Sequence, residues 1–174
     1  MRVHNIKKFD MENTLGHGAS TTVWVNYCPH RCEGCFNEYT WEKDESLEIP
    51  NNEIVDKVLK GLNGPMKLNS LCWLGGEPLN YFNASDVLEV TQKVKEIRPD
   101  IFVYSYSGYT WEQIVRMRHL KELIKELDVI IDGRFMKDLV TLGEPAGSSN
   151  QRIIDVQKSL AQDKVVLYNW KENY

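Results

Sequence analysis

Short apolar runs alternate with longer amphipathic stretches along most of this chain. Runs rich in β-branched and aromatic residues predict four strands, at residues 21–26, 70–74, 101–106 and 128–133. Ser70 to Leu74 is almost continuously apolar, which is typical of a strand buried on both faces. Between the strands, apolar residues at helical spacing predict helices from the candidate N-cap Asn51 to about residue 62 and from Ser85 to just before Pro99.

The remaining segments carry weaker patterns. Thr110 to Gln113 has the sequence of a capping box and predicts a third helical region that runs, with interruptions, to about residue 127. Residues 9–20 are expected to form a loop. The residues from 139 onwards predict a looser tail, in which residues 165–168 could form a last strand.

The alternation of strands and helices predicts an α/β fold with right-handed crossovers and a parallel sheet. In such folds, ligands bind at the carboxyl ends of the strands. Four turns directly follow predicted strands: the loop that begins at Cys28, Gly75 to Pro78, Ser107 to Tyr109, and Asp132–Gly133. We therefore expect these four turns to share one edge of the sheet and to form a site there.

Composition narrows the class of protein. A chain of 174 residues with 42% hydrophobic and 26% charged residues suits a single soluble domain over residues 1–174. The net charge of -4 argues against a nucleic-acid partner, and no run of about 18 apolar residues predicts a membrane span. The basic N-terminus is not followed by an apolar segment, so we expect an uncleaved cytoplasmic chain with reduced thiols.

Three of the four cysteines, Cys28, Cys32 and Cys35, lie within eight residues at a C-x3-C-x2-C spacing. Three thiols cannot pair among themselves, so the cluster indicates a metal centre. Structural zinc requires a fourth ligand, and a simple electron-transfer 4Fe–4S cluster requires a fourth cysteine. The triad thus favours a 4Fe–4S cluster with one open iron, and a zinc knuckle completed by His30 is the alternative. Cys72 lies within a predicted strand and is expected to be a small buried hydrophobe.

The turn from Gly75 to Pro78 is a second candidate element of the site. Its two glycines would let the backbone approach a ligand closely. Glu77 offers an acceptor beside them, and Pro78 fixes the turn. Such a turn suits the ammonium group of a small zwitterion.

Together, the cysteine loop after one strand and the Gly-Gly-Glu-Pro turn after the next resemble the radical S-adenosylmethionine superfamily. Within it, the chain resembles the activating proteins of anaerobic ribonucleoside-triphosphate reductases, over roughly residues 9–155. This narrower resemblance rests on residues 28–37 with Thr40–Trp41, residues 107–110, and residues 131–135 with 147–152. The residues after about 155 would be a variable C-terminal tail.

The resemblance implies a partial, open parallel β/α barrel of the radical S-adenosylmethionine type. Cys28, Cys32 and Cys35 would hold a 4Fe–4S cluster, and the amino and carboxylate groups of S-adenosylmethionine would bind its fourth iron. An electron from a flavodoxin-like donor would cleave that cofactor, and the 5′-deoxyadenosyl radical would take a hydrogen atom from a glycine of the partner reductase. The family's activity is therefore that of an oxidoreductase that generates a glycyl radical.

The resemblance also implies roles for single residues. Gly75, Gly76, Glu77 and Pro78 match the turn that holds the methionine end of the cofactor. Gly34, Cys35 and Phe36 match the backbone near the adenine; because Gly34 stands where the superfamily often has an aromatic residue, Phe36 is the expected stacking partner.

Asp132 matches an acidic residue near the cofactor, and a loop cap is the alternative. At the level of the whole protein, the alternatives are an activase of another glycyl-radical enzyme, of the pyruvate formate-lyase type, and a non-catalytic iron–sulfur or zinc module.

Overall fold

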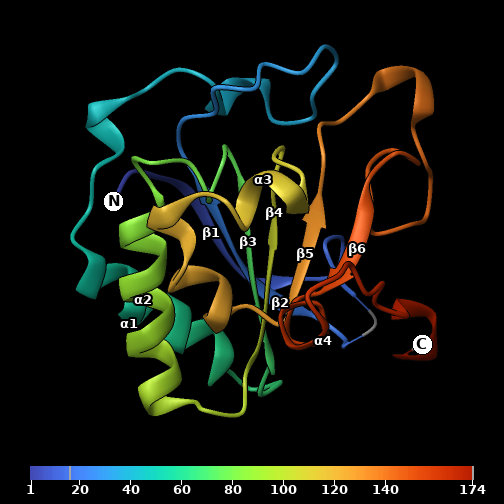
Figure 1. Ribbon diagram of the computed structural model, residues 1–174. Coiled ribbons are helices and arrows are strands. Elements are labelled where there is room, and N and C mark those ends of the chain that lie inside the picture. The colour runs from blue at the N-terminus through green and yellow to red at the C-terminus, as the bar shows by residue number, and fades with distance from the viewer. Residues whose placement is uncertain (16, 174) are drawn as a thin grey trace.

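The computed structural model describes residues 1–15 and 17–173, so Gly16 of the predicted loop and Tyr174 of the predicted tail lie outside the described residues. A single six-stranded sheet organises the fold, and its strands lie side by side in chain order (Figure 1). They are β1 (Val3–Asp10), β2 (Ser20–Val25), β3 (Ser70–Gly75), β4 (Phe102–Tyr106), β5 (Val129–Asp132) and β6 (Arg152–Asp155). Strands β2 to β5 are parallel, and the edge strands β1 and β6 are antiparallel to their neighbours. Within the described residues the two edges do not pair, so the sheet is open. The predicted α/β class is confirmed, but the predicted parallel sheet holds only for β2 to β5, because both edge strands are antiparallel.

Two long helices connect the first parallel strands. They are α1 (Asn51–Leu62), between β2 and β3, and α2 (Ala84–Ile97), between β3 and β4. Both pack on the same side of the sheet (Figure 1). Two shorter helices are α3 (Trp111–Ile114) and α4 (Val156–Gln162), and single 3-10 turns occur at Glu38–Thr40, Glu45–Leu47, Arg118–Leu120, Leu123–Glu126, Lys137–Leu139 and Trp170–Asn173. No helix of the described chain has both the length and the apolar character needed to cross a bilayer.

The two faces of the sheet are buried in different ways. Side chains such as Val23 and Trp73 point toward α1 and α2 and form the larger core. Their neighbours in sequence, such as Cys72 and Leu74, point to the opposite face and pack in a smaller core against Leu15 and the C-terminal tail. Ser70 to Leu74 is fully buried, as predicted for a strand covered on both faces. Because helices cover only one face, space is left on the other face near the carboxyl ends of the strands.

The sequence pattern missed β1. Residues 9 and 10 were expected in a loop, but they form the end of a strand that pairs with β2. Most of β1 is polar and partly exposed, so it lacks the apolar alternation that marks a strand. The strand is held instead by pairing and by the buried Asp10, whose carboxylate accepts a hydrogen bond from Thr22 at 2.8 Å.

Two further predictions needed correction. The capping box at Thr110 is confirmed, and Gln113 accepts the Thr110 N–H at 2.9 Å, but the helix is only four residues long and gives way to 3-10 turns. The predicted strand at residues 165–168 is reduced to a single bridge between Leu167 and Ile154. The tail instead forms β6 and α4, and α4 begins where the Asp155 side chain accepts the Lys158 N–H at 2.9 Å.

Candidate functional site

A cavity of about 610 Å³ lies at the carboxyl ends of the parallel strands, within the usual size range of small-molecule sites. Figure 1 shows the loop after β2 passing above the upper ends of the central strands. The cavity is lined by this loop and by the ends of β3, β4 and β5, as the topology predicted. The predicted site residues that it brings together are Cys28, Cys32, Cys35, Phe36, Gly75, Gly76 and Glu77.

The cysteine loop has an irregular backbone that β2 feeds directly. Tyr27, Arg31 and Gly34 all have positive φ values, of 78°, 48° and 70°. Such values are uncommon for residues other than glycine, and they occur where the surrounding structure imposes them. Backbone hydrogen bonds from Tyr27 to Thr40, at 2.7 Å, and from Cys28 to Trp41 close the base of the loop.

Burial and nearby negative charge disfavour the thiolate form of two of the cysteines. Burial, followed by the Glu77 carboxylate, raises the pKa of Cys28 to about 12. Burial and the neighbouring Cys35 also raise the pKa of Cys32. At neutral pH these groups are therefore thiols in the metal-free protein, so binding a metal centre must release protons.

The three thiols line one cavity, but they do not converge on a single point. Among the described residues, no group of three or more His, Cys, Asp or Glu side chains is arranged to hold one metal ion. A 4Fe–4S cluster takes one thiolate for each iron, so its ligands do not share one coordination sphere. The donor set of three cysteines therefore fits such a cluster by its chemistry.

The glycines at 75 and 76 allow the turn after β3 to pack against the chain that leads into the cysteine loop. A Cβ atom on Gly76 would lie 2.4 Å from the Tyr27 carbonyl oxygen, and one on Gly75 would lie 2.9 Å from Cα of Trp24. The turn also donates two backbone hydrogen bonds, from Gly76 to Val25 at 2.8 Å and from Glu77 to Tyr27 at 2.9 Å. The close approach that the sequence assigned to a ligand is thus made, at least in part, to the protein itself.

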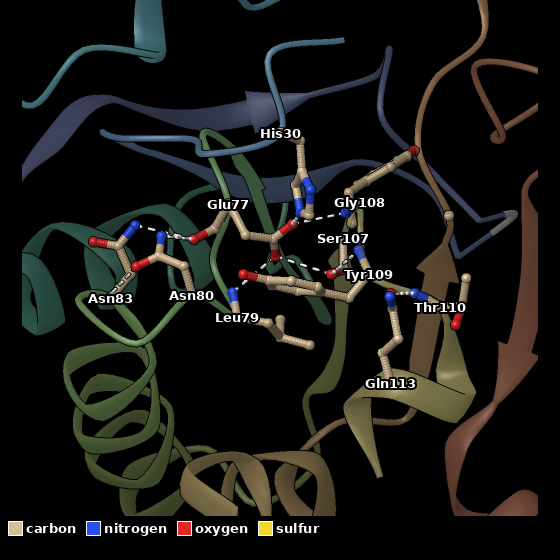
Figure 2. Close-up of polar contacts among 12 residues, drawn as sticks. His30, Glu77, Leu79, Asn80, Asn83, Ser107, Gly108, Tyr109, Thr110 and Gln113 are labelled. Atoms are coloured by element: carbon tan, nitrogen blue, oxygen red, sulfur yellow. Dashed lines mark hydrogen bonds and ion pairs between the residues drawn. The ribbon is translucent and has the colours of Figure 1, made fainter. Parts of the chain in front are cut away.

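Glu77 is 1% exposed, and both of its oxygens are hydrogen-bonded (Figure 2). Its Oε2 accepts from His30 Nε2 at 2.8 Å and from the Gly108 N–H at 2.7 Å. Its Oε1 accepts from Ser107 Oγ at 2.9 Å and from the Leu79 N–H at 3.0 Å. This carboxylate joins three of the four predicted turns, and His30 Nε2 points at Glu77 instead of at the cysteines.

Three predicted site residues do not line the cavity: Gly34, Pro78 and Asp132. Asp132 faces a second, polar cavity of about 570 Å³, where its Oδ2 accepts from the Trp111 N–H at 2.6 Å and from Arg152 Nη2 at 2.5 Å. These contacts correspond to the loop-cap alternative. Glycine at position 34 is explained by sterics, since its φ is positive and a Cβ there would lie 3.2 Å from Cβ of Lys137.

Sequence reasoning missed two residues of the site. Phe135 lines the cavity with Phe36, and their ring centroids lie 5.0 Å apart. For His30 the sequence suggests only the role of a zinc ligand. The signal for His30 was its place between two cysteines, but nothing in the sequence connects it with Glu77, which is 47 residues away.

Comparison with known proteins shows the family of this chain. Residues 14–154 match the model of the family described as a 4Fe-4S single cluster domain. The chain is 32% identical to the anaerobic ribonucleoside-triphosphate reductase-activating protein of Vibrio cholerae, over 88% of this chain and 97% of that protein. The protein of the same name from Enterobacteria phage T4 is 32% identical over 79% of this chain and 85% of its own, and that from Salmonella typhi is 30% identical over 87% and 96%. These relatives share one name and match this chain over most of their length, and the family model describes an iron–sulfur domain. The chain therefore belongs to the family of anaerobic ribonucleoside-triphosphate reductase-activating proteins.

Proposed function

We propose that this protein is an oxidoreductase that activates an anaerobic ribonucleoside-triphosphate reductase through radical S-adenosylmethionine chemistry. The observation that carries the proposal is that three thiols of one loop and the Gly75–Glu77 turn line a single cavity. The open, mostly parallel sheet is compatible with the partial barrel of that superfamily. The names of the relatives support the reductase as partner.

Cys28, Cys32 and Cys35 would hold three irons of a 4Fe–4S cluster. Two other candidate ligands beside them are engaged, since His30 Nε2 donates to Glu77 and both Glu77 oxygens accept hydrogen bonds. The resemblance to the radical S-adenosylmethionine superfamily assigns the fourth iron to the amino and carboxylate groups of S-adenosylmethionine. When bound, the reduced cluster and this cofactor supply the one-electron cleavage that yields a 5′-deoxyadenosyl radical and, from it, a glycyl radical on the reductase.

The chain's own residues would bind the cluster and orient the cofactor. The thiols lose their protons as the cluster binds, because burial holds the pKa of Cys28 and Cys32 high in the metal-free protein. The backbone of Gly75 and Gly76 forms the wall assigned to the methionine end of the cofactor. The Phe36 ring is 70% exposed and, together with Phe135, offers an apolar surface for the adenine. The roles of Gly34, Pro78 and Asp132 stay predictions.

The reaction also needs an electron donor and a reducing compartment. We assign the electron to a flavodoxin-like protein and the activity to the cytoplasm, where thiols stay reduced.

The test is anaerobic reconstitution with iron and sulfide, followed by reduction in the presence of S-adenosylmethionine. We expect a brown protein that forms 5′-deoxyadenosine and methionine in equal amounts. Mixing with the reductase should then give the EPR doublet of a glycyl radical. A colourless protein with stoichiometric zinc would overturn the proposal. A doublet only on a reductase-unrelated partner, such as an enzyme of the pyruvate formate-lyase type, would overturn the choice of partner.

A further inference from the structure

His30 lies between two cysteines of the loop, but its ring points inward. The side chain is only 5% exposed, and Nε2 lies 2.8 Å from Glu77 Oε2. Because an ionised carboxylate only accepts hydrogen bonds, Nε2 carries the proton and donates it. Figure 2 shows the ring directly above the Glu77 carboxylate. His30 therefore connects the cysteine loop to the turn after β3.

The same carboxylate fixes the turn after β4. Ser107 donates through its hydroxyl at 2.9 Å and Gly108 through its backbone N–H at 2.7 Å. The Glu77 carboxylate is 1% exposed, so losing one of its donors would cost free energy. This cost holds each donor in place. Glu77 thus sets the relative positions of the cysteine loop, its own turn and the end of β4.

The His30 ring is also held by close packing. Its centroid lies 4.5 Å from that of Tyr109, in an edge-to-face arrangement. A Cβ atom on Gly108 would lie 2.3 Å from Cδ2 of His30, so a side chain at this position would displace the ring. The φ of Gly108 is not in the positive region, so the ring, and not the backbone conformation, is what requires glycine here.

Two ion pairs of the cysteine loop lie at the surface. Arg31 pairs with Glu42 at 2.5 Å, and these side chains are 54% and 77% exposed. Glu33 pairs with Lys137, where both partners are again well exposed. Exposed pairs of this kind contribute little to stability. The contact of His30 with Glu77 is buried.

We propose that His30 is a positioning residue that, through Glu77, keeps the cysteine loop in register with the Gly75–Glu77 turn. This inference rests on the proposed function, in which the loop holds the cluster and the turn holds the methionine end of the cofactor. Its effect falls on the relative placement of these two subsites. The contacts that hold His30 are those to Glu77, Tyr109 and Gly108.

The first test compares His30→Ala, His30→Gln and Arg31→Ala after reconstitution. The glutamine amide nitrogen can replace Nε2 as donor, and Arg31→Ala removes the neighbouring surface pair as a matched control. We expect His30→Ala to raise KM for S-adenosylmethionine by roughly ten- to a hundredfold, which is the range by which loss of an outer-shell partner lowers metal affinity or activity at metal sites. It should also weaken the change that S-adenosylmethionine causes in the EPR spectrum of the reduced cluster. His30→Gln should recover most of both readouts, and Arg31→Ala should match the wild type.

A His30→Ala protein that takes up no cluster, while His30→Gln does, supports the same conclusion. Equal behaviour of the alanine and glutamine variants would overturn it, whether both fail or both match the wild type.

The second test needs no cluster. Gly108→Ala should lower the urea midpoint of the metal-free protein because its Cβ meets the His30 ring. In the His30→Ala background the ring is gone, so this shift should shrink at least about twofold, since residues in contact are not additive. Additive shifts would overturn the inference.

The two proposals fail separately. A wild-type protein that cleaves no S-adenosylmethionine refutes the proposed function, while the urea cycle still tests the contact between His30 and Gly108. A wild-type protein that does so with a His30→Ala variant of equal KM and EPR spectrum refutes only the role of His30.

Discussion

Replacing Gly76 by alanine tests how rigidly the cysteine loop is seated on the sheet. The new Cβ would lie 2.4 Å from the Tyr27 carbonyl oxygen and 2.8 Å from its carbonyl carbon. These are backbone atoms, which cannot rotate away as a side chain could. Since ordinary contact begins at 3.4 Å, the turn and the start of the cysteine loop must separate by about 1 Å.

The expected loss of stability has two parts: the cost of overpacking and the weakening of two backbone hydrogen bonds. Overpacking of a fitted site costs about 1–3 kcal/mol. The backbone hydrogen bonds from Gly76 to Val25 and from Glu77 to Tyr27 are stretched as well, and each contributes roughly 0.5–1.5 kcal/mol. We therefore expect Gly76→Ala to lower the free energy of unfolding by about 2–6 kcal/mol.

The assay is urea unfolding of the metal-free protein under reducing, anaerobic conditions, followed by circular dichroism. Gly143→Ala is the matched control, because Gly143 has a φ of 75° and nothing within 4 Å of its Cβ position. The control carries the same change in the unfolded chain and should cost only about 1–2 kcal/mol for its backbone conformation. If Gly76→Ala destabilised no more than this control, the close approach would be soft and our account of the glycine turn would be wrong.

Three further predictions concern other parts of the site. Cys28→Ala should abolish cluster uptake, while Cys72→Ala, which alters a fully buried residue outside the cavity, should keep the cluster; iron and sulfide analysis decides, and loss of the cluster in Cys72→Ala would contradict the three-cysteine ligand set. Hydrogen bonds from Arg152 lower the pKa of Glu112 from 4.5 to about 2, so Glu112 stabilises the fold above its ordinary pKa, and the contribution is lost as the pH falls toward 2. Urea midpoints of wild type and Glu112→Gln should accordingly differ at pH 7 and converge near pH 2, and a difference that grew in acid would refute this sign. Asp132→Asn should lower the free energy of unfolding by about 1–3 kcal/mol because it weakens the contacts to Trp111 and Arg152, and a raised KM for S-adenosylmethionine would show the predicted cofactor role in addition.

Much of the fold could be predicted because its central strands are apolar on both faces. The runs at 70–74 and 101–106 are largely apolar and lie buried in the middle of the sheet, as is typical of parallel strands, and the helix between them follows its apolar stripe. The edge strand β1 escaped prediction because it is held by pairing with β2 and by a buried aspartate, which leave no apolar period in the sequence. The sequence pattern also does not predict β6 and α4 in the tail, because these elements are short and depend on contacts with β5.

For the site, the residue types and their spacing are enough to predict a metal centre. Three cysteines at a short spacing cannot be a disulfide framework, and glycine-bearing turns after parallel strands must meet at one edge of the sheet. How these turns are joined depends on contacts that form only in the folded chain. Glu77, expected to face a ligand, is enclosed by donors from three segments, and His30 is one of them. The physical reason is that a buried carboxylate must be satisfied, and its donors come from residues that are distant in sequence and adjacent only after folding.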